Sequence, residues 1–312
     1  MSTPKARSEA LRICHFSDLH LPLRREPRAY ELANKRALGW LNLKLRRGRS
    51  HRLDVLEGLL AGVSSERADL HVVTGDFTSL ALPDEMADIR ALLDRFGLTP
   101  DNTVVVPGNH DRYTIAADLR SAFERAFGEY TGAPEGRERP YPTLRAAGPV
   151  AVCGIDTAVW RGPIRAAGRI DARQVERLVA LLGGEGAAGR WPVLVMHHPP
   201  FELEGAPLRQ YRVGLEGREL LAPALAGRSG TILHGHLHVL SRRRLGGFDV
   251  IGAPSASNAA GDDRHQAAYH VYTFDRAGLV EGRIVRCWPD GQGWRRENLP
   301  LPEPAQPEGG PA

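Results

Sequence analysis

Cysteine is scarce in this chain: three occur among 312 residues, at positions 14, 153 and 287. They form no CxxC pair, so neither a cysteine-rich zinc site nor a disulfide framework is indicated. Two of the three lie in apolar runs typical of strands. We therefore expect buried, reduced thiols with a packing role.

Long apolar runs and aromatic side chains are also lacking. No stretch reaches the roughly 18 apolar residues of a membrane helix, and the first residues lack the apolar segment of a signal peptide. We expect a cytoplasmic protein. Aromatic residues make up 6% of the chain and form no cluster with basic residues, so a base-stacking groove for nucleic acid is not expected. The net charge of +4 is mild and favours phosphate-bearing substrates.

Five short apolar runs of strand type each end in a polar cluster. They cover residues 11–17, 69–74, 102–107, 191–196 and 230–234. Helical patterns are expected at 83–96, 115–127, 171–183 and 217–227. Alternating strands and helices indicate βαβ units, and in such sheets ligands bind beyond the carboxyl ends of the strands. All five polar clusters should converge there.

The second half adds strand patterns without intervening helices. They lie at 143–147, 150–155, 239–245, 247–252, 267–274 and 281–287. Together these elements predict an α/β fold, a four-layer α/β/β/α sandwich of two mixed sheets flanked by helices. We assign residues 1–298 to this domain. The Pro- and Gly-rich segment 299–312 is expected to be a disordered tail.

The polar clusters at the strand ends carry oxygen and imidazole donors but no thiolate. They are Asp18 with His20, Asp76, Asn109 with His110 and Asp111, His197 with His198, and His236 with His238. Such donors suit Mn, Fe, Zn or similar divalent ions. Glycine precedes Asp76, Asn109 and His236, which lets the backbone turn sharply and approach the ions closely.

In this order, DxH, GD, GNHD, H and GHxH, the clusters resemble the pattern of the calcineurin-like metallophosphoesterase superfamily over about residues 12–240. The resemblance implies a divalent-metal-dependent phosphohydrolase with two ions, manganese being favoured. It assigns the first ion to Asp18, His20, Asp76 and His238. It assigns the second ion to Asp76, Asn109, His197 and His236, so that Asp76 bridges the two.

The same resemblance implies a mechanism. A hydroxide between the ions would be the nucleophile, since two cations depress the pKa of bound water. His110 would stabilise the developing charge or protonate the leaving oxygen, with Asp111 orienting its imidazole. His198 is expected either to face the substrate or to pack. The other histidines, His51 among them, are expected to be structural.

Motif details bear on the substrate, a phosphodiester or a pyrophosphate. The HHPP stretch at residues 197–200 resembles bacterial cyclic-nucleotide phosphodiesterases. The UDP-diacylglucosamine pyrophosphatases, which act on a lipid-linked nucleotide, are similar too, although their best-known branch has Arg in place of His110. A catalytically silent scaffold of the same fold is disfavoured because every motif residue is present.

Residues 24–52 form an insertion-like segment with ten Lys or Arg against two Glu. A helical wheel places Tyr30, Ala37, Leu38, Leu41 and Leu45 on one apolar arc, expected to pack on the domain. Leu32 and Leu43 would project among basic residues such as Arg36 and Arg47. The segment is then a packed helix with a solvated basic face, a peripheral membrane contact, or a lid over an anionic substrate.

Overall fold

Strands and helices alternate through the first two thirds of the chain, and strands dominate the last third. The computed structural model describes residues 10–45, 50–119, 121–131, 141–162, 164–205, 207–259, 262–290 and 293–305. The strands are β1 (Leu11–Phe16), β2 (Leu70–Val73), β3 (Thr103–Val105), β4 (Thr143–Ala147), β5 (Val150–Gly154), β6 (Gly168–Arg169), β7 (Trp191–Val195), β8 (Leu215–Glu216), β9 (Ser229–His234), β10 (Ser241–Leu245), β11 (Gly247–Gly252), β12 (Ala268–Asp275), β13 (Gly278–Pro289) and β14 (Trp294–Pro300). The helices are α1 (Arg36–Leu45), α2 (Leu53–Ser65), α3 (Pro83–Arg95), α4 (Ile115–Leu119), α5 (Ala122–Phe127), α6 (Ala172–Gly183), α7 (Pro207–Val213) and α8 (Leu221–Ala224), with 3-10 turns η1 (Ala29–Leu32), η3 (Gly128–Thr131) and η4 (Arg218–Leu220).

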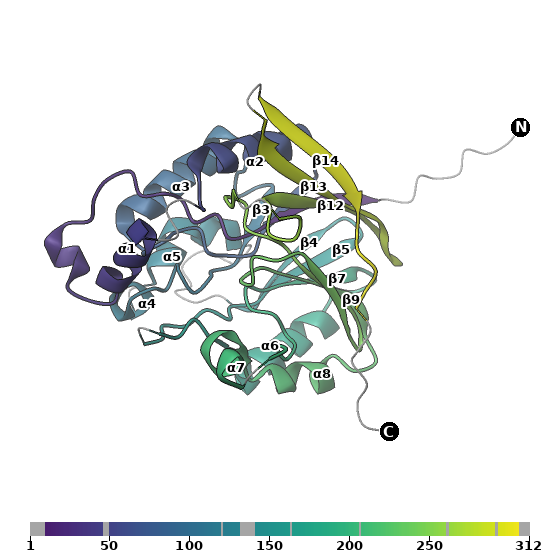
Figure 1. Ribbon diagram of the computed structural model, residues 1–312. Coiled ribbons are helices and arrows are strands. Elements are labelled where there is room, and N and C mark those ends of the chain that lie inside the picture. The colour runs from purple at the N-terminus through teal and green to yellow at the C-terminus, as the bar shows by residue number, and fades with distance from the viewer. Residues whose placement is uncertain are drawn as a thin grey trace, which may run out of the picture.

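Two mixed six-stranded sheets form the centre of the molecule (Figure 1). The first has the order β14-β13-β12-β1-β2-β3, and the second has the order β10-β11-β9-β7-β5-β4. Within the first sheet β1, β2 and β3 run parallel, and within the second β11, β9, β7 and β5 run parallel. The parallel strands of each sheet therefore end at one edge, where the polar clusters begin.

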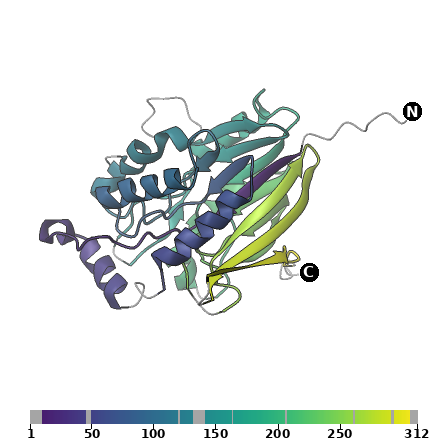
Figure 2. The same cartoon turned by 90° about the horizontal axis from the view of Figure 1, so that it is seen from above.

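Three apolar layers hold the sandwich together. Helices α2, α3 and α5 pack on the first sheet, side chains of the two sheets meet in the middle, and α6 and α8 pack on the second sheet. Figure 2 shows the helices on the outer faces of the sheets, seen from above. The predicted four-layer α/β/β/α sandwich is confirmed.

Most expected elements lie where the sequence placed them. The structure adds the short elements β6, α7 and β8, which were not expected, and differs in three larger respects. The helix expected at 115–127 is divided into α4 and α5, where Ser121 has a left-handed φ of 47°. Helix α2 was not expected. Strand β14 also was not, and it occupies the end of the predicted domain and the start of the predicted tail. Beyond it, Ala305 N donates to Arg242 O at 2.9 Å, so residues up to 305 lie along the second sheet; residues 306–312 of the predicted tail lie outside the described residues.

Two predictions, one about the cysteines and one about membrane-spanning helices, can be compared directly with the structure. Cys14, Cys153 and Cys287 are free and buried, as expected. None of the helices in the described part of the chain has the length and apolar character needed to cross a membrane.

Helix α1, in the basic insertion, packs on the domain through a different face from the predicted one. A Cβ at Gly39 would lie 2.4 Å from Tyr113 Oη, so glycine permits the close approach of the helix. Arg36 Nε donates to Leu80 O at 2.7 Å, and Leu43 packs against the core. Arg36 and Leu43 therefore anchor the helix instead of projecting into solvent.

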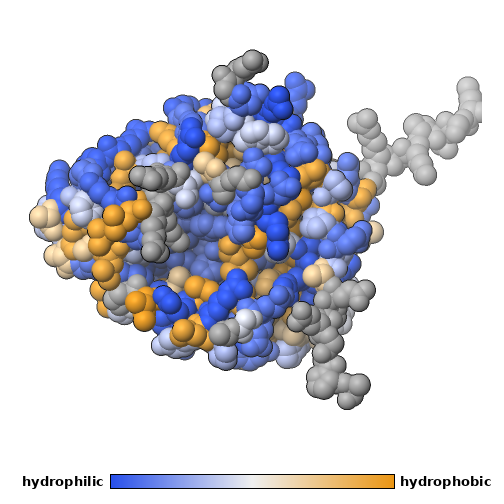
Figure 3. Space-filling model, in the orientation of Figure 1, coloured by the Kyte–Doolittle hydropathy of each residue, from blue (hydrophilic) through white to orange (hydrophobic). Residues whose placement is uncertain are grey.

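Four of the five residues of the arc that was expected to pack are exposed instead, and Ala37 is half-buried. The exposed fractions of Leu38, Leu41 and Leu45 are 56%, 48% and 70%, and that of Tyr30 is 67%. Figure 3 shows apolar surface over η1 and α1, at the left of the molecule. The prediction about the packed face is wrong because the helical wheel took only apolar area into account, whereas the close approach at Gly39 and the hydrogen bond of Arg36 decide which face contacts the domain. Arg46 and Arg47 lie outside the described residues.

Candidate metal centre

The loops that follow five parallel strands bring the seven predicted ligand residues together. Asp18 and His20 follow β1, Asp76 follows β2, Asn109 follows β3, His197 follows β7, and His236 and His238 follow β9. The first five of these residues are buried, and the last two are half-buried. The predicted convergence of the clusters is thus present in the fold.

One group of donors surrounds the space between Asp18 and Asp76. His20 Nε2 lies 3.1 Å from His238 Nε2 and 3.6 Å from Asp76 Oδ2. His238 Nε2 lies 3.1 Å from Asp18 Oδ1. Yet Asp18 Oδ1 is among the buried polar atoms of the described residues that have no hydrogen-bond partner. A buried carboxylate oxygen left in this way is suited to a cation.

A second group lies on the other side of Asp76. His197 Nε2 is 3.5 Å from Asp76 Oδ2, 3.2 Å from Asn109 Oδ1 and 3.2 Å from His236 Nδ1. The same oxygen, Asp76 Oδ2, therefore lies near a histidine of each group. This position suits a carboxylate shared by two ions.

The separations match those between ligands of one metal ion. Nitrogen and oxygen ligands lie about 2.0–2.2 Å from zinc-like ions, so neighbouring ligands at tetrahedral or octahedral angles are about 3.0–3.5 Å apart. Measured pairs fall between 3.1 and 3.6 Å for His20 with His238, His20 with Asp76, and His197 with Asp76. His20 Nε2 lies farther from Asp18 Oδ1, at 3.9 Å, so the donors fit a divalent metal centre after small adjustments.

Backbone carbonyl groups set which ring nitrogen carries the proton. His197 Nδ1 lies 2.6 Å from Thr74 O, and His236 Nε2 lies 2.8 Å from Val213 O. Each of these nitrogens donates to its carbonyl, so in the neutral rings the lone pairs of His197 Nε2 and His236 Nδ1 face each other across 3.2 Å. Two facing lone pairs repel unless a cation lies between them. Ligating histidines in proteins are held in this way.

The charges in the centre also call for a cation. Burial raises the pKa of Asp76, but the neighbouring imidazoles of His197, His110 and His20 hold it well below its usual range. Burial lowers the pKa of His197, but Asp76 and Asp18 raise it to about 9. The two buried carboxylates therefore attract positive charge strongly, and a divalent ion supplies it.

Five of the seven ligand residues have left-handed backbone conformations. The φ angles are 54° at Asp18, 40° at His20, 55° at Asp76, 69° at His236 and 53° at His238. Non-glycine residues rarely adopt such angles, and their concentration in one place is typical of functional sites. The turns rotate side chains one residue apart toward the same space.

The glycines before the ligands act mainly through the space they leave. A Cβ at Gly108 would lie 2.2 Å from Asp76 Oδ1, and a Cβ at Gly235 would lie 2.4 Å from Asp18 Oδ2. Only Gly75, before Asp76, also has a positive φ, of 93°. Close approach of the loops therefore explains why Gly108 and Gly235 are glycines, and the positive φ explains Gly75.

The structure corrects the role expected for Asp111. His110 Nδ1 lies 2.7 Å from Ser79 O, so this carbonyl orients the imidazole. The Asp111 carboxylate instead accepts from the backbone N–H groups of Gly108, at 2.9 Å, and Thr78, at 3.0 Å. Asp111 thus ties the loop after β2 to the loop after β3. Burial and the Asp76 carboxylate raise the pKa of Asp111 to about 7.

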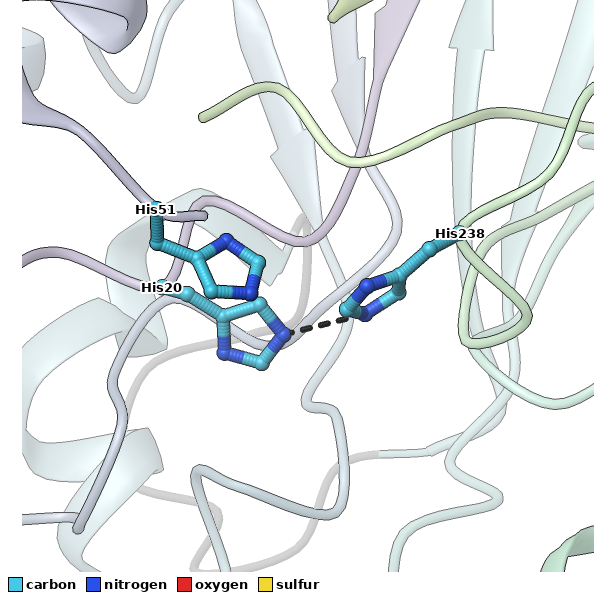
Figure 4. Close-up of side chains that lie close together, drawn as sticks. All are labelled: His20, His51 and His238. Carbon is cyan, nitrogen blue, oxygen red and sulfur yellow. Dashed lines mark hydrogen bonds between the residues drawn. The ribbon is translucent and has the colours of Figure 1, made fainter. Parts of the chain in front are cut away.

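Two further histidines lie next to the predicted ligands. His198 is buried, and its ring nitrogens lie 2.9 Å from Thr157 Oγ1 and 3.0 Å from Ala166 O, so it packs and joins these two loops. His51 was expected to be structural, but its ring lies beside His20 and His238 (Figure 4). No motif marks His51 in the sequence.

A cleft of about 780 Å³ opens above His110 and Asn109. Its lining includes the cations Lys35, Arg165, Arg209 and Arg212 and the exposed apolar residues Leu38, Ile164 and Leu208. No acidic residue lines it in the described part of the chain. The cleft therefore combines positive charge with exposed apolar residues at its mouth.

Adjoining clusters of carboxylate, amide and imidazole donors at the strand ends of an α/β/β/α sandwich form a candidate divalent-metal centre. Residues 11–240 match the family described as calcineurin-like phosphoesterase, and the chain belongs to that family.

Known relatives agree with this membership. A protein of Rhodococcus erythropolis named "Probable cyclic nucleotide phosphodiesterase" is 29% identical over 208 residues, which are 65% of this chain and 61% of that protein. The match thus spans less than two thirds of the relative's length. A dimetal phosphatase of Danio rerio shares the fold with a TM-score of 0.59 at 13% identity, covering 94% of this chain and all of that one (100%). The purple acid phosphatase PPD1 of yellow lupin has a TM-score of 0.57 at 15% identity, covering 94% of this chain and 54% of that one.

Proposed function

We propose that this chain is a phosphohydrolase that cleaves a phosphodiester or pyrophosphate bond with two divalent ions, manganese being favoured. The observation that carries the proposal is the position of Asp76 Oδ2, near His20 on one side and His197 on the other. The first ion would be held by Asp18, His20, Asp76 and His238. The second would be held by Asp76, Asn109, His197 and His236. Bound ions lower the pKa of water and neutralise charge on the phosphate.

His110 is proposed as the proton donor to the leaving oxygen. Its backbone N–H donates to Asp76 Oδ1 at 2.7 Å, and its Nδ1 donates to Ser79 O. Its ring stacks on Tyr113 with 5.1 Å between ring centroids and lines the cleft. A side chain fixed on three sides in this way can present Nε2 to a leaving group without reorganisation.

Lys35 is proposed to bind a substrate anion. Its Nζ lies 4.5 Å from the centroid of the Tyr113 ring and donates weakly to Arg161 O and Arg165 O, both at 3.4 Å. Burial lowers the pKa of Lys35 to about 8. With Arg165, Arg209 and Arg212 in the same lining, the cleft favours a substrate with more than one negative charge.

The apolar mouth favours a substrate that also carries an acyl chain. At one lip Leu38 of helix α1 lines the cleft, and the exposed Leu41 lies one turn further along the helix. At the other lip Ile164 and Leu208 line it, and the exposed Tyr211 lies one turn beyond Leu208. Figure 3 shows apolar surface on both sides of the hollowed centre. Exposed apolar patches beside cations suit the surface of an anionic membrane. We therefore propose a lipid-linked nucleotide of the UDP-diacylglucosamine type, hydrolysed by a cytoplasmic enzyme at the membrane surface.

A cyclic nucleotide is the second candidate substrate. The Rhodococcus erythropolis relative carries that activity in its name, and the HHPP stretch occurs at residues 197–200. The cations of the cleft would suit the cyclic phosphate equally well. An apolar mouth would then have no role in binding.

A panel of bis-p-nitrophenyl phosphate, cyclic nucleotides and UDP-diacylglucosamine with Mn²⁺ tests the proposal. The account predicts the highest kcat/KM for the lipid-linked substrate, and co-sedimentation with anionic but not neutral vesicles at low salt. A higher kcat/KM for a cyclic nucleotide, with no vesicle binding, would contradict the lipid-linked assignment. Hydrolysis of none of these substrates would contradict the phosphodiester and pyrophosphate assignment.

A variant carrying Leu38→Ser and Leu41→Ser tests the lip. Burying one leucine is worth at least about 1.5 kcal/mol, so losing two should weaken vesicle binding about a hundredfold. Val280→Ser is the matched control, because Val280 is 61% exposed on strand β13, away from the cleft. Equal losses in both variants would show that the effect is not specific to the lip.

A further inference from the structure

The imidazole of His51 points into the same space as two predicted metal ligands (Figure 4). Its ring centroid lies 4.7 Å from that of His20 and 5.6 Å from that of His238. One ring nitrogen of each of the three histidines lies within 4.8 Å of the others. His51 is buried, with an exposed fraction of 7%.

The backbone around His51 is fixed to a loop from the other end of the chain. Arg52 N donates to Ser257 O at 3.0 Å, and Ala259 N donates to Ser50 O at 2.8 Å. These bonds hold the end of the basic insertion against residues 257–259. A residue needed only to join the two segments would not have to carry an imidazole, because the backbone bonds already join them.

The side chain of His51 is oriented as a ligand is. Its Nδ1 lies 2.8 Å from Ser257 Oγ, and the tautomer that donates to this hydroxyl leaves the lone pair on Nε2. Ser255 Oγ, 3.4 Å from Ser257 Oγ, donates to Asp18 O at 2.6 Å. Metal-ligating histidines characteristically donate their other ring nitrogen to such a partner. The hydroxyl pair thus links His51 to the loop that carries Asp18.

We propose that His51 is an additional nitrogen ligand of the ion assigned to Asp18, His20, Asp76 and His238. This inference rests on the proposed function, which supplies that ion. The set would then hold three imidazoles and two carboxylates, with His51 entering it beside His20 and His238. Such a donor set favours Zn, Fe or Mn over Mg or Ca.

As a metal ligand, His51 would connect the lip of the cleft formed by helix α1 to the metal ion. His51 stands between helix α1, which forms one lip of the cleft, and helix α2, which packs on the first sheet. Metal binding would then fix the C-terminal end of the insertion. The insertion is in this view part of the metal centre.

Titration of the metal-free protein with Co²⁺, by calorimetry and visible absorption, tests the assignment without measuring turnover. His51→Ala should weaken one of the two sites by at least about 10–100-fold and change the absorption of that Co²⁺. Ser257→Ala, which keeps the imidazole but removes its partner, should weaken the same site by a smaller factor. His51→Gln serves if the alanine variant does not fold.

His265→Ala is the control, because it removes a half-exposed imidazole outside the centre, and both its sites should match wild type. Retention of both wild-type affinities and the wild-type spectrum in folded His51→Ala would overturn the ligand alone. A wild-type chain that binds neither ion would overturn the proposed function and this ligand together.

Discussion

Replacing His110 by alanine removes the proposed proton donor while leaving all seven proposed metal ligands in place. The imidazole is held by Ser79 O at 2.7 Å and by its stacking on Tyr113. The backbone N–H that donates to Asp76 is retained in the variant. We therefore expect unchanged metal content and a selective loss of turnover.

The size of the loss follows from the role. General acid catalysis contributes about 10²–10⁴-fold, or about 2.7–5.4 kcal/mol of barrier, so kcat should fall at least about a hundredfold for an alkyl phosphodiester. A p-nitrophenolate leaves readily without a proton. The loss on bis-p-nitrophenyl phosphate should therefore be much smaller.

Steady-state kinetics of wild type, His110→Ala and His110→Asn on both substrates separates proton donation from charge stabilisation. An asparagine amide can donate a hydrogen bond but cannot transfer a proton. Equal impairment of His110→Ala on the two substrates, together with recovery in His110→Asn, would refute the proton-donor role. It would leave His110 as a stabiliser of charge.

Three further changes have defined outcomes. Gly108→Ala puts a Cβ 2.2 Å from Asp76 Oδ1, so metal analysis should show loss of both ions and assays should show loss of activity. Gly128→Ala, with open space around the glycine, should match wild type in both measurements. Lys35→Met removes a substrate cation worth about 1.5 kcal/mol, so KM should rise about tenfold with kcat nearly unchanged; an unchanged KM would contradict the role. Burial lowers the pKa of His270 to about 3, below its unfolded value of about 6.5. Its contribution to the free energy of unfolding is therefore fully present above pH 6.5, and it is lost at about 1.4 kcal/mol per pH unit as the pH falls toward 3. Urea unfolding at pH 7 and pH 5 should show a smaller pH dependence in His270→Leu than in wild type.

The strand-end motifs made the core of the fold and the convergence of the predicted ligand residues foreseeable. Residues such as Asp18 and Asp76 directly follow short buried strands, and parallel strands bring such positions to one edge. Strand β14 was missed because its sequence, WRRENLP, is almost wholly exposed and shows no apolar alternation. An edge strand of this kind is stabilised by pairing with β13, which local sequence does not reveal.

Tertiary contacts decided the features that the sequence left hidden. Helix α1 turned its apolar arc outward because Gly39 admits Tyr113 and Arg36 binds a backbone carbonyl. His51 joins the centre only because the segment before α2 pairs with residues 257–259, more than 200 positions later. His110 is oriented by a carbonyl oxygen, which no side-chain motif encodes.

The shared carboxylate is the central claim, and the metal content of wild type and Asp76→Ala tests it most directly. Both proteins would be loaded with Mn²⁺, freed of loosely bound metal and analysed by mass spectrometry. The account predicts two ions per wild-type chain and loss of both ions and of activity in Asp76→Ala. A replete wild-type chain with a single ion, or an Asp76→Ala chain that keeps two ions and full activity, would contradict it.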